Sequence, residues 1–402
     1  MEANKKIYLY ADASICCAGR TWDGSLQENL VRPDYSPSFQ LRTMGELSCP
    51  VAMVPDCQLS VQEGKPRIEA LLDQVLEQIQ GPVADCIGRY GAERVGVCAG
   101  SCDNGSEASL AAHRALFSAG SFPQGYSLSR QNPSQVADYI RTRLRTAGPA
   151  LTVATACASS ATAVIEAAQL VLAGTCDAVV VAGVDLVSPT VFLGFGSLEA
   201  VSPTGCNPFS RNRNGITLGE AAACLIVAKD RPATKDYVEL LGFGESADAS
   251  HMTAPLETGA GAAAAMEEAL AMAGLDRSQI SYVNLHGTGT PLNDAMESRA
   301  VAGVFPESSR DGRLKLSSTK AVTGHTLGAA GCLELSVCMR TLYDKRMAGG
   351  LPIHRWDGER DDALPALHFV EPGDSLEGTA CMTNSFAFGG CNTSLVIGRD
   401  RT

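Results

Sequence analysis

Short apolar runs alternate with stretches of helical periodicity along most of the chain, a pattern typical of α/β proteins with buried sheets. An unbroken run of small and branched apolar residues, such as DAVVVAG, predicts a strand that is covered on both faces. The longer segment Ser159–Ala173 predicts a helix. In the first part of the chain, strands are expected at Lys6–Tyr10, Arg94–Gly100, Leu151–Ala156, Asp177–Gly183 and Ala221–Ala228.

The same alternation starts again near residue 235, so we expect two similar α/β halves, residues 1–235 and 236–402. The segment Trp22–Pro66 contains several prolines and little periodicity, and is expected to be an irregular cap or loop region. Strands are expected in the second half at Tyr237–Glu245, Tyr282–Leu285, Lys315–Ser317, Thr379–Ser385 and Thr393–Gly398, and helices at Ala262–Ala273, Ala295–Val304 and Leu327–Tyr343.

Composition narrows the class of protein. Hydrophobic residues make up 45% and charged residues 19% of the 402 positions, which is ordinary for a folded globular protein. The net charge of −12 disfavours nucleic acids and anionic membranes as partners, because the field of the whole molecule repels both. No apolar run approaches the ~20 residues that span a bilayer, and no cleavable signal is visible, so we expect a cytoplasmic protein without membrane insertion.

Cysteine is frequent, with fifteen residues, but no C-x-x-C occurs, so most are expected to be reduced, buried and small. Cys157 is different, because it follows a predicted strand and stands at the start of a predicted helix in TACASS. The positive end of a helix dipole lowers the pKa of a thiol, so this position favours a nucleophile. An inert buried cysteine is the alternative.

Three other segments contain residues suited to catalysis. His286 leaves a strand in VNLHGTGTPLND, and His325 follows Lys320 in STKAVTGHTLGAAG, just before a helix that contains Glu334. Near the C-terminus, TNSFAFGGCNTS has adjacent glycines whose backbone N–H groups could face a ligand, as in an oxyanion hole. Taken singly, each segment is equally compatible with a structural histidine or an ordinary tight turn.

In this order, the motifs resemble the β-ketoacyl-acyl-carrier-protein synthase family, in its elongating type with a Cys-His-His site on the thiolase fold. CNPFSRNRNGITLGEAA (Cys206–Ala222) and ASHMTAP (Ala249–Pro255) extend the resemblance, which runs from about Arg94 to Val396. It implies two thiolase-like halves that form a layered α-β-α-β-α core, the first with the nucleophilic cysteine and the second with both histidines. No cofactor and no metal are implied.

The resemblance also implies residue roles. Cys157 would accept an acyl group from a carrier-protein thioester, and His286 and His325 would stabilise the enolate formed from a malonyl thioester. The backbone N–H groups of Cys157 and Phe388 would form the oxyanion hole. Lys320 and Glu334 would support the histidine loop, and Thr288 and Thr290 would contact the pantetheine arm. Phe386, Gly389 and Gly390 would bind substrate in the C-terminal turn. Phe388 would act as a gate, and Ala387 beside it replaces the glycine that the family usually has.

The implied reaction is a decarboxylative Claisen condensation in fatty acid or polyene/polyketide synthesis. The stretch PLND (Pro291–Asp294) is similar to condensing enzymes of aryl polyene pathways. The alternative function is that of a non-catalytic subunit, like the chain-length factors, although such subunits lose the nucleophilic cysteine.

The expected partners are an acyl carrier protein with its phosphopantetheine arm and, in a dimer, a second copy or a related synthase subunit. Because carrier proteins are acidic, the candidates for a basic dock are Lys65, Arg67, Arg211 and Arg213.

Overall fold

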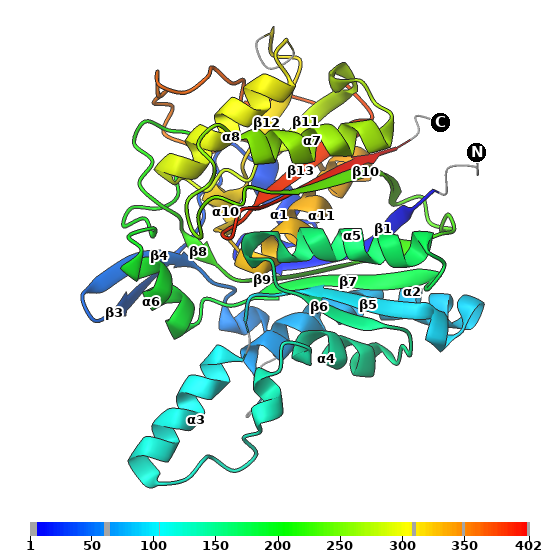
Figure 1. The fold of residues 1–402 in the computed structure, drawn as a ribbon, viewed down its shortest axis with the longest axis vertical. Helices are drawn as coiled ribbons and strands as arrows, with labels where there is room; N and C mark the ends of the chain where they lie inside the picture. The colour runs from blue at the N-terminus through cyan, green and yellow to red at the C-terminus, as the bar shows by residue number, and fades with distance from the viewer. Residues whose placement is uncertain (1–5, 60–64, 104, 308–310, 348–349, 400–402) are drawn as a thin grey trace.

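The protein is described by a computed structural model that covers residues 6–59, 65–103, 105–307, 311–347 and 350–399. Its main feature is an eleven-stranded mixed sheet, accompanied by a three-stranded sheet at one side (Figure 1). The order along the large sheet is β12 (Lys315–Ser317), β11 (Ile280–Asn284), β13 (Ala380–Phe386), β14 (Cys391–Gly398), β10 (Tyr237–Ala247), β1 (Tyr8–Cys16), β9 (Ala221–Ala228), β7 (Ala178–Asp185), β5 (Val95–Gly100) and β6 (Ala150–Val153), with β2 (Gly19–Arg20) beside β1.

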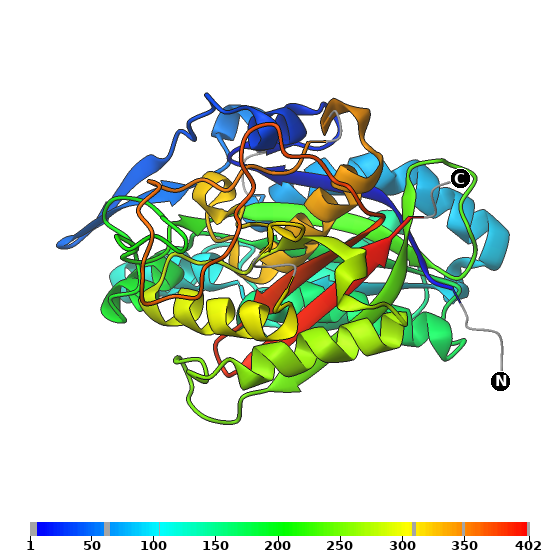
Figure 2. The ribbon, with the colours of Figure 1, turned by 90° about the horizontal axis from the view of Figure 1, so that it is seen from above.

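Apart from β2, the sheet consists of two five-stranded groups that meet at the antiparallel pair β1–β10. Helices α5 (Ser159–Leu172) and α11 (Ala330–Tyr343) lie between the two groups and contact strands of both. Helices α2 (Arg67–Tyr90) and α4 (Gln135–Leu144) cover one outer face, and α7 (Ala260–Ala273) with its neighbour α8 (Pro291–Val304) covers the other (Figures 1 and 2). The predicted α/β class with α-β-α-β-α layering is confirmed.

Small residues allow the central helices to approach the sheet and each other closely. A Cβ atom at Gly100 would lie 2.3 Å from the backbone nitrogen of Ser160, and one at Gly331 would lie 2.6 Å from that of Ala161. Strands β7 and β9 are buried along their whole length, because helices cover both of their faces. The Ala- and Gly-rich stretches of the sequence therefore reflect tight helix–sheet packing.

Most predicted strands and helices are present within a few residues of the expected ends, but the first strand is longer. Strand β1 continues through Asp12 to Cys16, although the charged Asp12 ended the predicted strand. The carboxylate is buried there because Arg340 donates to it at 2.8 Å and Ser336 donates from the same helix. Arg340, 328 residues away in the sequence, thus stabilises the charged Asp12 inside a strand that the sequence predicted to end before it.

The prediction of an irregular segment over Trp22–Pro66 was wrong for a large part of its length. The segment contains α1 (Ser25–Val31), the hairpin β3 (Gln40–Met44) and β4 (Leu47–Ala52), and a 3₁₀ turn at Asp56–Gln58; its residues 60–64 lie outside the described residues. Pro50 is tolerated because it lies in the short hairpin, where β4 adds only two pairs to β8 (Leu218–Gly219). The division into halves at residues 235/236 falls between β9 and β10 and stays a prediction.

Two further observations concern the chain as a whole. All fifteen cysteines are free thiols, and most are buried. In the part of the chain that the structure describes, no helix has the length and apolar character needed to cross a bilayer.

Candidate active site

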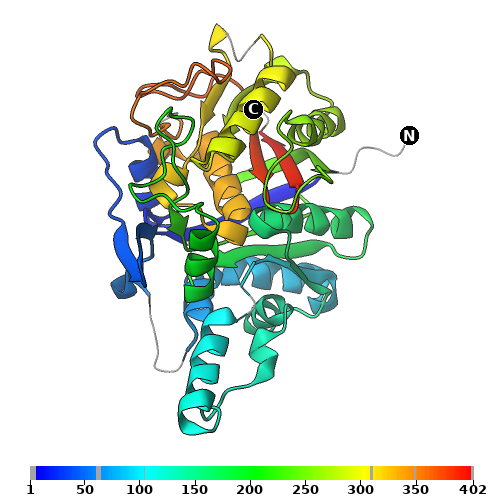
Figure 3. The same cartoon turned by 60° about the vertical axis from the view of Figure 1, so that its left-hand side comes forward.

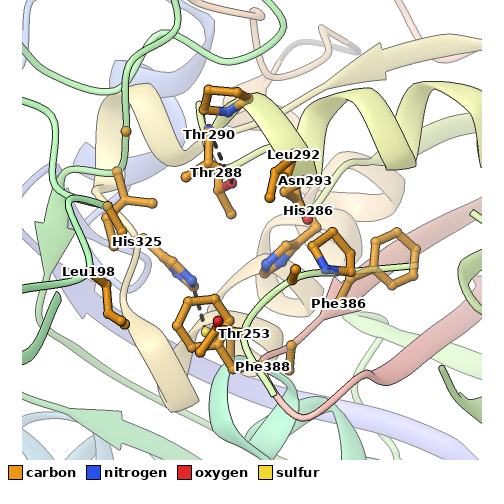
Figure 4. A pocket seen from close by; sticks show the side chains of 18 of the residues that line it. Leu198, Thr253, His286, Thr288, Thr290, Leu292, Asn293, His325, Phe386 and Phe388 are labelled. Atoms are coloured by element: carbon orange, nitrogen blue, oxygen red, sulfur yellow. Dashed lines mark hydrogen bonds between the residues drawn. The ribbon is translucent and has the colours of Figure 1, made fainter. Parts of the chain in front are cut away.

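Cys157, His286 and His325 all line one cavity of about 300 Å³. Figure 4 shows the two histidine side chains in this cavity. Cys157 follows β6, His286 follows β11, and His325 follows the short helix α10 (Lys320–Thr323). All three side chains are buried, with exposed fractions of 6%, 1% and 2%. The three residues predicted from separate motifs therefore share one site.

Cys157 lies in a 3₁₀ turn, Ala156–Ala158, between β6 and the start of α5 at Ser159. The preceding Ala156 has φ 49°, a left-handed conformation that costs a non-glycine residue about 1 kcal/mol or more. This sharp turn directs the thiol into the cavity, where Sγ lies 3.1 Å from Nε2 of His325. Strain held by the surrounding structure is typical of functional positions.

The expectation of an acidic thiol at Cys157 was wrong. The pKa of this thiol is raised to about 12, mainly by burial and also by the carboxylates of Asp185 and Glu334, whereas Lys320 and the residue's own backbone N–H lower it. Removing water around the sulfur therefore outweighs the favourable effect of the helix start. At neutral pH the resting nucleophile is a neutral thiol.

The loop of His286 is held by two carboxylates from α8. Glu297 accepts the backbone N–H groups of His286 and Gly287 at 2.8 and 2.7 Å, and Asp294 accepts those of Thr288 and Gly289 at 3.1 and 3.2 Å. Burial raises the pKa of Glu297 to about 8 and also raises that of Asp294.

Neither carboxylate was among the predicted site residues. The sequence did contain a signal for them. Two acidic residues three positions apart on a predicted helix lie on the same face, and this helix comes directly after the HGTGT loop.

The position of His325 is fixed by its backbone hydrogen bonds and by a strained residue, Leu327, two positions later. Its N–H donates to the carbonyl of Thr217 at 2.7 Å, its carbonyl accepts from Gly219 at 2.9 Å, and Leu327 has φ 52°. The rings of His286 and His325 meet edge to face, with centroids 5.3 Å apart. Burial, together with the charge of Lys320, holds the pKa of both imidazoles well below the usual value, so both are neutral.

Lys320 and Glu334 lie behind the histidines, as the motifs predicted. Both side chains are buried and form an ion pair, and the ammonium group of Lys320 also lies 3.5 Å from Nδ1 of His286. An ammonium group has only donors, so it places the proton of neutral His286 on Nε2, the ring nitrogen that remains. Burial raises the pKa of the Glu334 carboxyl, and Lys320 opposes this shift.

The FGG turn differs from the expectation. The N–H groups of Gly389 and Gly390 do not face the cavity as free donors, because they donate to the carbonyls of Met252 and Ala387 at 2.7 and 3.0 Å. Their φ angles of 86° and 77° explain why glycine is needed at both positions. Ala387 avoids positive φ, so a methyl group fits there without strain.

The remaining predicted residues also line the cavity. The ring of Phe388 stacks on Phe195 of α6 (Pro189–Ser197) with centroids 5.6 Å apart, and Phe386 packs against His286. Thr288 and Thr290 lie on the cavity wall, with their hydroxyl groups 2.9 Å apart.

A fully buried carboxylate, Asp185, joins two loops beside the nucleophile. It accepts the N–H groups of Cys102, Asp103 and Gly328 at 2.6 to 3.1 Å, and the hydroxyl of Ser101. Burial raises its pKa to about 7. No sequence motif pointed to this residue.

The four candidates for a basic dock are paired within the chain. Lys65 pairs with Asp73, Arg67 with buried Glu220 and with Asp56, Arg211 with Asp362, and Arg213 with Asp361. Their charges are therefore largely compensated locally.

Comparison with known families gives two adjacent matches. The family model described as beta-ketoacyl synthase, N-terminal domain, matches residues 84–233, and that described as beta-ketoacyl synthase, C-terminal domain, matches residues 237–353. Together they cover well over half of the chain.

Curated relatives and solved structures agree with these matches. The 3-oxoacyl-[acyl-carrier-protein] synthase 2 of Vibrio cholerae is 35% identical over 83% of this chain and 80% of its own length. A chain from the complex of ketosynthase ApeO with its chain length factor ApeC from Xenorhabdus doucetiae is 36% identical, with a TM-score of 0.87 over 98% of each chain. A β-ketoacyl synthase from Burkholderia phymatum is 28% identical, with a TM-score of 0.82 over 99% of this chain and 100% of its own.

Proposed function

The chain belongs to the β-ketoacyl synthase family, and from that membership we propose that it carries an acyl group on Cys157 and condenses it with a malonyl thioester from an acyl carrier protein. One observation carries the assignment of the site: Nε2 of His325 lies 3.1 Å from the sulfur of Cys157, with His286 beside it. The product is a β-ketoacyl thioester two carbons longer than the acyl group.

In the first step, the thiol of Cys157 attacks the acyl thioester. The thiol is neutral at rest, so its proton has to leave as the new S–C bond forms, and His325 Nε2 is the base within reach. The proton then passes to the departing pantetheine thiolate. The backbone N–H groups of Cys157 and Phe388 are the proposed donors to the oxyanion.

In the second step, the malonyl thioester loses CO2 and leaves an enolate. Decarboxylation requires no base at carbon, but it requires donors at the developing oxyanion. Neutral His286 supplies one donor, because Lys320 keeps its proton on Nε2, and neutral His325 supplies the other after acylation only in the tautomer whose proton is on Nε2. The enolate carbon attacks the acyl-Cys157 thioester, and the tetrahedral intermediate expels the cysteine thiolate, which takes one proton from water to restore the resting thiol.

The convergence of Cys157, His286 and His325 also supports a catalyst over a non-catalytic partner of the chain-length-factor kind. Such a partner has no use for a nucleophile within hydrogen-bonding distance of an imidazole. The acyl substrate that we propose is of the polyene type, on the resemblance of Pro291–Asp294.

A second synthase subunit is the proposed dimer partner. Strand β6 ends the order of the large sheet and exposes Leu151, and α3 (Ser106–Ala119) projects from the body nearby (Figure 3). Phe117 on α3 is 85% exposed and Leu128 after it is 73% exposed. An open strand edge and large exposed apolar side chains are each typical of a surface that is covered in an assembly.

Intact-mass analysis after incubation with a panel of acyl carrier proteins, including saturated, polyene and aryl polyene acyl groups, tests the proposal. We expect the mass of one acyl group on the wild-type chain and none on Cys157→Ser. An acyl mass that persists in Cys157→Ser would refute the assignment of the nucleophile. Sedimentation of the wild type and of Leu151→Arg tests the dimer edge, since a charge on β6 should favour the monomer.

A further inference from the structure

Three of the six histidines in the chain are buried, and the proposed mechanism uses only two of them. The third is His354, which is 4% exposed and lies in the segment between α11 and β13. None of the sequence motifs contains it. Because a buried imidazole needs partners for both of its ring nitrogens, those partners indicate what the residue does.

Both ring nitrogens of His354 hold backbone groups of other loops. The backbone N–H of Ser318 donates to Nδ1 at 3.1 Å, and Nε2 lies 3.2 Å from the carbonyl oxygen of Pro208. An N–H group can only donate and a carbonyl can only accept, so the imidazole is neutral and carries its proton on Nε2. Burial lowers the pKa of His354 to about 3, although the bond to Pro208 opposes this shift.

Aromatic side chains fix the plane of the His354 ring. Phe369 stacks on it with centroids 4.1 Å apart, and Phe209 and Trp356 pack against it with centroids at 5.9 and 5.8 Å. Aromatic pairs at these distances attract one another and restrict the rotation of the ring. The imidazole therefore keeps one orientation, and its two hydrogen bonds have a fixed geometry.

The first of these bonds holds the loop that carries Lys320. The hydroxyl of Ser318 donates to the carbonyl of Gly287 at 2.6 Å and accepts the backbone N–H of Lys320 at 3.2 Å. Ser318 thus joins the start of α10 to the residue after His286. The ammonium group of Lys320 lies 3.5 Å from Nδ1 of His286, where it keeps the imidazole proton on Nε2.

The second bond holds a strained turn against the loop of His286. Pro208 precedes Phe209, whose φ of 61° is uncommon for a residue other than glycine. The backbone N–H of Phe209 donates at 2.7 Å to Asp294, the carboxylate that also accepts from the His286 loop. A Cβ atom at Gly287 would lie 2.8 Å from the ring of Phe209, so this ring is close to the loop. Both bonds therefore converge on the loop of His286.

We propose that His354 is a positioning residue for decarboxylation, because it fixes the places of Lys320 and of the His286 loop. This inference rests on the proposed function, in which His286 donates from Nε2 to the developing enolate. His354 does not line the active-site cavity, so it acts only through these neighbours. Acylation of Cys157 depends on His325 instead and should be much less sensitive to His354.

Three substitutions separate the two hydrogen bonds. His354→Phe keeps a ring that can stack on Phe369 and removes both nitrogens. His354→Asn places an amide oxygen near the position of Nδ1 and restores the bond to Ser318, whereas His354→Gln places an amide nitrogen near that of Nε2 and restores the bond to Pro208. His368→Phe is the matched control, because His368 lies in the same segment but is exposed.

Each variant is loaded with an acyl group on Cys157 and mixed with a malonyl thioester over a range of concentrations. The release of CO2 is measured per loaded thiol, so only folded protein counts. We expect His354→Phe to lower kcat about tenfold or more, as for a displaced donor, and to change acyl loading and KM less than about twofold. The Asn and Gln variants should lie between His354→Phe and wild type, and His368→Phe should match wild type.

Three results would overturn the inference. They are release of CO2 by His354→Phe at the wild-type rate, acyl loading that slows as much as decarboxylation, and amide variants that are both as slow as His354→Phe. When His354→Phe does not fold, the amide variants decide, because each lacks one bond and wild-type rates in both would exclude a positioning role. Failure of the proposed function is distinguishable, because the wild-type chain would then take no acyl group or release no CO2.

Discussion

The pH dependence of alkylation at Cys157 follows from its burial. A thiol with a pKa of about 12 is only about one ten-thousandth ionised at pH 8, whereas an ordinary cysteine with a pKa near 8.5 is about a quarter ionised. The more basic thiolate is intrinsically more nucleophilic by about 1.5 orders of magnitude, which recovers part of this difference. We therefore expect iodoacetamide to modify Cys157 about one to two orders of magnitude more slowly than an ordinary cysteine.

The slope with pH separates ionisation from restricted access. Modification of Cys157, followed by peptide mass spectrometry, should rise about tenfold for each pH unit from pH 8 to 10, because thiolate is the minor form throughout. Restricted access would lower the rate without changing this slope. Exposed Cys57 in the same sample monitors the reagent. A rate at Cys157 that levels off near pH 7 would refute the reasoning and show that the helix start outweighs burial.

Other substitutions test the groups around the nucleophile. Asp185→Asn removes a charge that raises the pKa of Cys157, so alkylation should accelerate by up to about tenfold, and only above about pH 7, where Asp185 itself is ionised. Lys320→Met leaves Glu334 buried without its partner, and urea unfolding should show a loss of about 3–5 kcal/mol in the free energy of unfolding. Glu297→Gln places an amide donor against a backbone N–H, which costs about 1–3 kcal/mol of stability. Rapid-quench assays of that variant should show slower condensation with acyl loading retained.

The class of fold could be predicted because its signals are local, whereas the three reactive side chains were identified from the order of their motifs, which resembles that of a known family. Apolar strand runs followed by small residues and helices fix the α/β class, and the same runs place Cys157 and His286 at strand ends. Cys157 and His286 follow strands of different five-stranded groups, and they meet because both groups pack on α5 and α11. His325 lies in the turn before α11 itself.

The properties that could not be predicted depend on packing between distant residues. The pKa of Cys157 is set by the removal of water, which no local motif reports. The carboxylate of Asp12 is buried because Arg340 pairs with it, and the N–H of Gly389 is not free because it donates to the carbonyl of Met252. Such contacts join segments that only the folded chain brings together.

Single-turnover condensation tests the central claim most directly. The acyl-Cys157 protein is isolated, mixed with a malonyl thioester labelled at the carbon next to its thioester carbonyl, and quenched over time. We predict that the acyl mass leaves Cys157 at the rate at which a labelled β-ketoacyl thioester and CO2 appear. Release of a free acid, or of CO2 without loss of the acyl mass, would contradict the account.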